Sequence, residues 1–153
     1  MNNKKQIKQL LLTAIRANLN QRKAAINQRL GDIMAGLQNE TKSTAGDKHE
    51  TGRAMLQIER ENLGRQLAVV EQQELTIQRI AATKKLERAA LGALIKTASG
   101  NYFLSISKGE LKIENETYYA IGLGSPIGKL LLGKQKGDQF EFGGKIIIVD
   151  DII

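Results

Sequence analysis

The sequence contains no cysteine, no tryptophan and a single proline, and only 4% of its 153 residues are aromatic. Without cysteine the chain can form neither a disulfide framework nor a thiolate metal site, which fits a reducing cytoplasm. No apolar run approaches the ~20 residues of a membrane span. The run at residues 10–15 resembles a signal peptide, but Arg16 interrupts it and the apolar residues continue at helical spacing. We therefore expect a cytoplasmic protein that makes no membrane contact.

The sequence carries an excess of positive charge, most of it in residues 1–84. The net charge is +7, and residues 1–84 hold 14 Lys+Arg against 8 Asp+Glu, whereas residues 85–153 hold 9 against 8. An excess of this size favours a polyanionic partner such as DNA or RNA. A solvated helix surface explains the same excess, and composition alone does not decide between the two interpretations.

Two long helical patterns occupy the first half of the chain, where no proline interrupts them. In both patterns the apolar residues recur at intervals close to a heptad repeat, as in a coiled coil. These residues are Ile15, Leu19, Ile26, Leu30, Ile33 and Leu37 in the first pattern, and Leu56, Leu63, Leu67, Val70 and Ile77 in the second. Because a short polar stretch separates the two patterns, they predict an antiparallel hairpin with Ile26, Leu30, Leu63 and Leu67 in its seam. The matching lengths favour a self-contained monomer, and an intermolecular four-helix assembly stays open.

The pattern changes after residue 84, where glycine becomes frequent and short β-prone runs appear. These runs are residues 93–97, 102–106, 117–121, 139–142 and 145–149. One short helix interrupts them, with Ser125 as its N-cap, Pro126 at its first position and Gly133 at its end. The sequence thus predicts an α+β protein: a helical hairpin over residues 1–84, and a small antiparallel sheet with one helix over residues 85–153. Such a module is too small for a deep enzyme cleft.

Two carboxylates, Asp47 and Glu50, stand three residues apart in the turn between the helical patterns. Asp at an N-cap with Glu at the third helical position is a capping box, so the pair has a purely structural explanation. A chemical explanation is compatible with it, because residues three apart share a helix face and two carboxylates can hold one cation. Cationic residues flank the pair and either aid solubility or contact RNA phosphates. They are Lys42, Lys48 and Arg53, and His49 lies between the two carboxylates.

Residues 125–138, with the sequence SPIGKLLLGKQKGD, resemble the C-terminal signature of the Gre-type bacterial transcript cleavage factors. That signature is followed by a Gly-Gly hairpin, as it is here at Gly143 and Gly144, and Gly46-Asp47-x-x-Glu50 is similar to the acidic tip of the same family. The resemblance implies that residues 85–153 form an FKBP-like domain. The chain departs from the family pattern at residues 51–54, which read Thr-Gly-Arg-Ala where the family has Asn-Ala-Glu-Tyr. It therefore resembles a divergent member.

What the resemblance implies is a transcription elongation factor that binds RNA polymerase and inserts its hairpin tip into the polymerase channel. There it would stimulate Mg²⁺-dependent cleavage of backtracked RNA at the nascent 3′ end, as an accessory factor and not as an enzyme in its own right. The resemblance assigns a shared Mg²⁺ to Asp47 and Glu50, and polymerase binding to Ser125, Pro126 and Ile127. Two alternatives stay open: a channel-binding regulator without cleavage activity, and a helical scaffold unrelated to polymerase.

Overall fold

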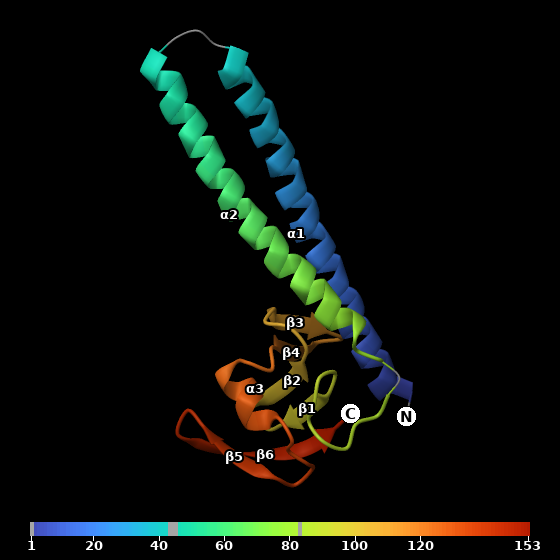
Figure 1. Ribbon diagram of the computed structural model, residues 1–153. Coiled ribbons are helices and arrows are strands. Elements are labelled where there is room, and N and C mark those ends of the chain that lie inside the picture. Colours follow the sequence, from blue (N-terminus) through green and yellow to red (C-terminus); the bar gives the residue numbers. More distant parts are fainter. Residues whose placement is uncertain (1, 43–45, 83) are drawn as a thin grey trace. The chain divides into compact units, whose positions relative to one another are not determined.

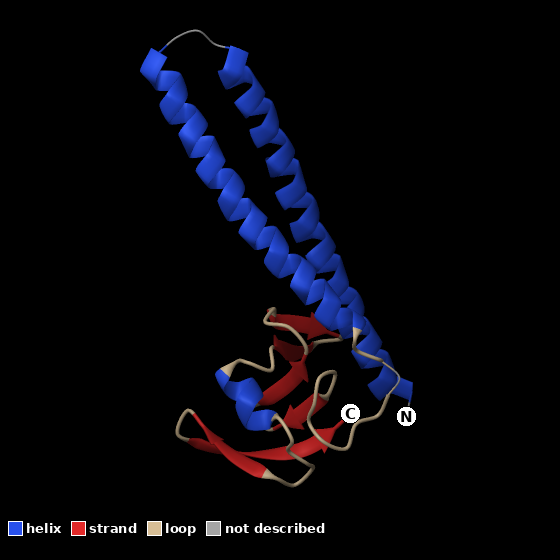
Figure 2. Cartoon of the chain, in the orientation of Figure 1, coloured by secondary structure: helices blue, strands red, loops and turns tan. Residues whose placement is uncertain are grey.

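The protein is described by a computed structural model that covers residues 2–42, 46–82 and 84–153. For residues 2, 3, 5, 40–42 and 46–50 only the backbone is described. Two long helices come first, and six strands with one short helix follow in the described residues (Figure 2). This confirms the predicted α+β class. Two compact units result, Ala17–Glu74 and a second unit that joins Leu75–Ile153 to the start of the chain up to Arg16. The predicted domain boundary between residues 84 and 85 stays a prediction.

The two long helices are α1 (Asn2–Lys42) and α2 (Gly46–Gln78). Within residues 17–74 they run side by side in opposite directions (Figure 1). The cross-helix contacts show the same reversal, because Arg22 meets Gln73 while Arg29, further along α1, meets Glu59, which comes earlier in α2. The predicted antiparallel hairpin is therefore confirmed. No helix in the described residues is long and apolar enough to cross a membrane.

Apolar side chains from both helices fill the hairpin seam. Leu19, Ile26 and Ile33 of α1 are buried, as is Val70 of α2. Ile15 and Ile77 are buried too, and the remaining residues of the predicted stripes, Leu30, Leu37, Leu56, Leu63 and Leu67, are half-buried. A hairpin of two helices covers each apolar stripe from one side only, which leaves the stripe margins partly open to water.

The six strands form one sheet in the spatial order β3-β4-β2-β1-β6-β5. The strands are β1 (Leu94–Thr97), β2 (Gly100–Leu104), β3 (Gly109–Ile113), β4 (Glu116–Ile121), β5 (Gln139–Phe142) and β6 (Lys145–Ile152). Helix α3 (Pro126–Leu131) lies between β4 and β5 in the chain. Five of the six strands correspond to predicted runs, and β3 was missed.

The prediction of a purely antiparallel sheet was wrong at one pair, because β2 and β4 are parallel. The hairpin of β3 and β4 joins the sheet through its second strand, so that β3 becomes an edge strand. The amino-acid composition of β3 and β4 explains why β4, and not β3, pairs with β2. Strand β4 contributes the buried Tyr118 and Ala120, whereas β3 exposes Glu110 and Lys112. Charged side chains suit a sheet edge, where they oppose pairing with further strands.

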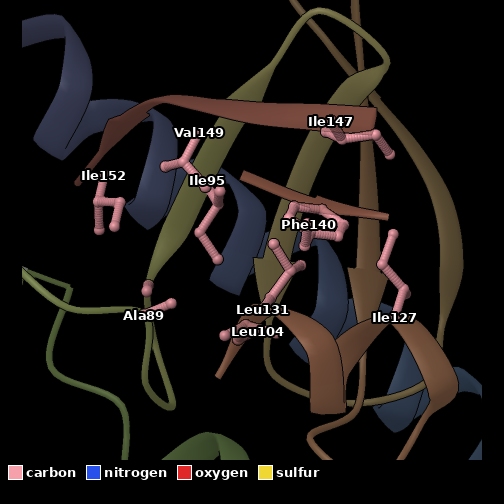
Figure 3. Packing of buried hydrophobic residues seen from close by; sticks show 10 residues of the cluster. Ala89, Ile95, Leu104, Ile127, Leu131, Phe140, Ile147, Val149 and Ile152 are labelled. Carbon is pink, nitrogen blue, oxygen red and sulfur yellow. The ribbon is translucent and has the colours of Figure 1, made fainter. Parts of the chain in front are cut away.

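A hydrophobic core lies between α3 and the sheet (Figure 3). Helix α3 contributes Ile127 and Leu131, and Ala89 and Ala93 come from the segment that precedes β1. The strands contribute Ile95, Leu104, Phe140, Ile147, Val149 and Ile152. Burial of this apolar surface holds α3 in a fixed position on the sheet.

Candidate functional site

The two carboxylates predicted to hold a metal, Asp47 and Glu50, lie in the first turn of α2. Since α1 ends at Lys42 and α2 begins at Gly46, the pair belongs to the end of the hairpin where the chain reverses. Their helical spacing of three residues puts the two positions on one side of the helix. The backbone of Asp47 is already helical, so Asp47 is not the N-cap that the capping-box interpretation requires.

The cationic residues predicted to lie near RNA are divided between the two helices. Lys42 is the last residue of α1, and Lys48 stands between the carboxylates together with His49. The side chains of these three, and of Asp47 and Glu50, lie outside the described part of the structure. Arg53 follows Glu50 at a spacing of three residues and is exposed. Arg53 is therefore available to a partner approaching this end of the hairpin.

Behind the acidic turn, α2 lines a shallow apolar groove. Its lining residues are Gly52, Met55, Leu56, Ile58, Glu59 and Asn62. Met55 and Ile58 remain 65% and 59% exposed. The helices approach closely at this level, since a Cβ on Gly36 would lie 3.2 Å from Leu56 Cδ1. Gly36 thus permits close packing of the two helices near their turn.

Ion pairs fix α1 against α2 along the hairpin. Arg29 binds Glu59 through two parallel hydrogen bonds, with Nε donating to Oε1 at 2.6 Å and Nη2 donating to Oε2 at 2.8 Å. The hydrogen bond from Arg29 lowers the pKa of the Glu59 carboxyl, and the same bond raises the pKa of Arg29. Lys23 and Glu74 form a second pair at 3.3 Å. A bidentate Arg–carboxylate pair also restricts sliding of one helix along the other.

The predicted polymerase-binding residues lie at the start of α3. Ser125 is the N-cap: its Oγ accepts from Gly128 N at 3.1 Å and donates to Gly122 O at 2.7 Å. Pro126 occupies the first turn and is exposed, whereas Ile127 is only 8% exposed and packs into the core of Figure 3. Ser125 and Pro126 can therefore meet a partner, but Ile127 acts by anchoring the helix.

Gly128 is a residue of this corner that the sequence analysis did not single out. A Cβ at Gly128 would lie 2.1 Å from the backbone oxygen of Gly122, closer than any real contact allows. Helix α3 therefore packs directly on the loop that follows β4. A glycine within a short helix is a weak sequence signal for such a contact, because it equally marks a helix end.

The later residues of the signature also have structural roles. Gly133 has a positive φ of 83°, and its N–H donates to Ala89 O at 2.7 Å. Asp138 Oδ2 accepts from Gln135 N at 2.8 Å and so closes the turn before β5. These contacts explain Gly133 and Asp138 through the fold alone.

A metal site with three or more protein ligands is absent from the described residues, since no group of that size of His, Cys, Asp and Glu could hold an ion there. The donor chemistry of Asp47 and Glu50 nevertheless fits Mg²⁺, which prefers oxygen ligands and is often held by one or two carboxylates. Two carboxylates supply only part of an octahedral shell, so a partner would have to supply the remaining ligands.

Comparison with known proteins gives little further guidance. No protein-family model matches the sequence, and no curated protein matches it. Among solved structures, the chain is similar to one described as the structure of the transcription factor Gfh1, with 19% sequence identity over 89% of this chain and 91% of that chain. The TM-score of this match is 0.34, and a likeness at this level supports no conclusion about the chain.

Proposed function

We propose that this protein is a transcription elongation factor that binds RNA polymerase and stimulates cleavage of backtracked RNA. The observation that carries the proposal is the acidic pair Asp47 and Glu50, three residues apart in the first turn of α2, where a hairpin of two long helices reverses. The likeness of residues 125–138 to the Gre-type signature supports it. The protein would act in the cytoplasm as a monomer, with the polymerase supplying the rest of the catalytic site.

Each residue of the acidic turn has a distinct role in this proposal. Asp47 and Glu50 would hold Mg²⁺ jointly with the polymerase and the RNA, and would not bind it tightly alone. A bound Mg²⁺ would polarise the scissile phosphate and lower the pKa of an attacking water. Lys42, Lys48 and Arg53 would contact phosphates near the RNA 3′ end and so position the strand.

The start of α3 would provide the contact with polymerase. Pro126 is exposed, and Leu130, one helical turn later, is 37% exposed although it is apolar. These two side chains lie on the same side of α3 because they are four residues apart. Ser125 would fix the first turn through its two hydrogen bonds, and Ile127 would tie the helix to the core.

A second function has a specific observation in its favour. Residues 51–54 read Thr-Gly-Arg-Ala and lack the tyrosine and the second glutamate of the family pattern. Gly52 stands inside α2, where glycine costs roughly 1 kcal/mol of helix stability relative to alanine. A protein with this turn could occupy the polymerase channel without stimulating cleavage. A helical scaffold with no polymerase partner is the third candidate.

The decisive test is an RNA-cleavage assay on backtracked polymerase complexes, with wild type, Asp47→Asn and Glu50→Gln. Each substitution keeps the size of the side chain but removes the charge that attracts Mg²⁺. We expect each to reduce stimulated cleavage by about 100-fold, comparable to removal of one electrostatic catalytic group. Binding to polymerase, measured by pull-down, should be unchanged, and raised Mg²⁺ should partly restore the weaker variant.

Glu61→Gln is the matched control, because Glu61 is an exposed carboxylate of α2 beyond the acidic turn. It should cleave like wild type. If wild type stimulates no cleavage but competes with a cleaving factor for polymerase, the channel-binding alternative is correct. If wild type does not bind polymerase, both polymerase functions are excluded and the scaffold interpretation stands.

A further inference from the structure

The net positive charge of the protein is concentrated in two short segments. Residues 1–16 contain four Lys+Arg and no acidic residue, and residues 75–92 contain four Lys+Arg and one acidic residue. The hairpin segment, residues 17–74, has eight of each sign, and residues 93–153 have seven of each. Both of these larger parts are therefore neutral. The excess of +7 belongs to the start of α1 and to the linker that leads from α2 into the sheet.

These two segments belong to one compact unit and touch each other. Lys8 Nζ of α1 donates to the backbone oxygen of Lys84 in the linker at 3.2 Å. Between the segments lies a groove of about 310 Å³. Its lining residues are Gln9, Leu12, Thr13, Arg16, Ile80 and Ala82. Leu12 and Ile80 are buried, so the polar side chains and Arg16 form its accessible part.

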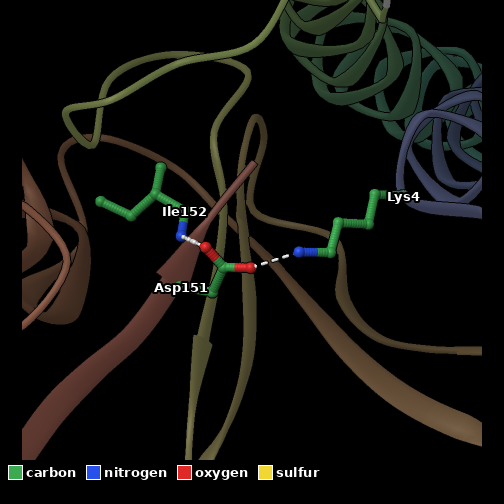
Figure 4. A network of polar contacts seen from close by, with 3 residues as sticks. All are labelled: Lys4, Asp151 and Ile152. Atoms are coloured by element: carbon green, nitrogen blue, oxygen red, sulfur yellow. Dashed lines mark hydrogen bonds and ion pairs between the residues drawn. The ribbon is translucent and has the colours of Figure 1, made fainter. Parts of the chain in front are cut away.

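Two of the cations in these segments are already engaged. Lys4 forms an ion pair with Asp151 Oδ2 at 2.6 Å, and the other oxygen of Asp151 accepts from Ile152 N (Figure 4). Lys8 is 1% exposed. Neither is therefore free to attract a partner, and Asp151 offsets the charge of Lys4.

Five other cations are exposed: Arg16, Arg79, Lys84, Lys85 and Arg88. In the part of the chain that the structure describes, none of them pairs with a carboxylate. The guanidinium group of Arg79 makes a long contact from Nη2 to Thr76 Oγ1, at 3.5 Å. Five unneutralised cations, of which Arg16 lines the groove, give the two segments a strongly positive surface, which we name the basic junction.

We propose that the basic junction binds the phosphate backbone of duplex DNA. Duplex DNA carries a dense, regular array of negative charge, about one per 1.7 Å of helix axis, and Lys and Arg side chains bind it by releasing condensed counterions. The junction lacks the features of the two competing partners. Residues 1–16 and 75–92 contain no aromatic residue on which single-stranded bases could stack. Of the apolar residues that line the groove, Leu12 and Ile80 are buried and Ala82 is half-buried, whereas a protein interface would be expected to have an exposed apolar centre.

This proposal rests on charge and geometry alone, and it does not depend on the function proposed above. It uses residues of α1 and of the linker, none of which belongs to the acidic turn or to the start of α3. Contacts to phosphates would bind DNA without regard to sequence. With about four phosphate contacts, the logarithm of the affinity should fall with the logarithm of salt concentration with a slope of about −3.6.

The test measures binding of the full chain to a labelled DNA duplex of about 25 base pairs by fluorescence anisotropy, over about 50 to 200 mM salt. The key variant is Lys84→Glu with Lys85→Glu. We expect its affinity at low salt to fall at least about tenfold, and its salt slope to become shallower by about 2, one unit for each lost phosphate contact. The matched control is Lys112→Glu with Lys145→Glu, two exposed lysines of the sheet that change the net charge equally.

The control should lose less than about threefold in affinity, because its charges lie outside the junction. Equal losses in both variants would show that only the net charge matters and would overturn the proposal. Absence of binding by wild type would overturn it too, as would equally tight binding of polyglutamate, which would assign the junction to acidic proteins. If circular dichroism shows that the first variant is unfolded, Arg16→Gln with Arg79→Gln replaces it and should lower the affinity in the same direction.

Discussion

At the scale of single residues, local rules predict α3 well. A Ser before a Pro starts a helix and a Gly ends it, and the structure confirms Ser125, Pro126 and Gly133 in these roles. Gly128 could not be predicted in the same way. Its role is a contact with the backbone of Gly122, which only the packed fold reveals.

Substitution of Gly128 by alanine should destabilise the sheet-bearing unit strongly. The added methyl group would overlap Gly122 O, a backbone atom that cannot move without displacing the end of β4. We expect a loss of at least about 2 kcal/mol in the free energy of unfolding, typical of overpacking against backbone. Urea denaturation measures it. Gly124→Ala is the control, because a Cβ there meets no atom within 4 Å. Equal stability of both variants would contradict the packing argument.

Lys8 is a buried lysine in the unit that contains the sheet. Its burial could not be predicted from the sequence, because the residues around it include two further lysines, Lys4 and Lys5. Its ammonium group has the backbone oxygen of Lys84 as its hydrogen-bond partner. Burial lowers the pKa of Lys8 from 10.5 to about 8, because the charged form loses hydration. Below pH 8 Lys8 is charged in both the folded and the unfolded state, so the cost of burying the charge is fully present there.

Comparison of Lys8→Met with wild type should expose this cost as a function of pH. Between pH 8 and 10.5 the folded state releases the Lys8 proton before the unfolded state does, so wild-type stability rises with pH relative to the variant. The gain should be at most about 3 kcal/mol. Urea denaturation of both proteins at several pH values measures the difference. A difference that stays constant with pH would show that Lys8 does not titrate in this range.

At the scale of elements, the hairpin is the part that periodicity predicts best. A heptad-like stripe specifies both a helix and the face that it buries, and the structure confirms the seam at Leu19, Ile26, Ile33 and Val70. The half-burial of Leu63 and Leu67 was not predictable. It depends on how much of the second helix one partner can cover, and this is a property of the packed pair.

Ile33 is the buried seam residue whose removal should weaken the hairpin most clearly. It is fully buried, so Ile33→Ala leaves a cavity between α1 and α2 and should cost about 2 to 4 kcal/mol of unfolding free energy. Loss of helical circular dichroism during denaturation measures this. Ile58→Ala makes the same chemical change at a largely exposed position and should cost less than about 0.5 kcal/mol. If the two variants lose equal stability, Ile33 is not a packing residue of the seam.

Strands were harder to predict than helices. Strand β3 has the sequence Gly-Glu-Leu-Lys-Ile. Its glycine and its charged residues are uncommon in strands, so the sequence alone is more typical of a loop. The turn that joins β3 to β4 is the feature that best indicates a hairpin. Glu114 and Asn115 both have positive φ, as a two-residue turn between strands requires, and asparagine tolerates this conformation well. The parallel pairing of β2 and β4 depends on which strand of that hairpin reaches the sheet, and this is decided by long-range burial.

At the scale of the whole molecule, the sequence predicted the class of fold and the position of the acidic pair. It placed the positive charge only coarsely. Counting over residues 1–84 assigned the excess to the helical arms as a whole, whereas residues 17–74 are neutral and the excess lies in residues 1–16 of α1 and in residues 75–92. The count could not resolve this, because the start of α1 belongs to the same compact unit as the sheet. Which segments share a unit is fixed by contacts between distant residues, such as Lys4 with Asp151, and composition carries no information about them.

The place of β6 inside the sheet has a consequence for how the chain acquires its structure during translation. Strand β6 lies between β1 and β5, and Ile153 exchanges backbone hydrogen bonds with Leu94. The hairpin segment contains its own seam partners and can therefore form early on the ribosome. The start of α1 is synthesised first among the described elements, yet its unit is completed by the last of them to be synthesised. Until β6 leaves the exit tunnel, Lys4 therefore lacks its partner Asp151, and the unit to which the start of α1 belongs stays incomplete.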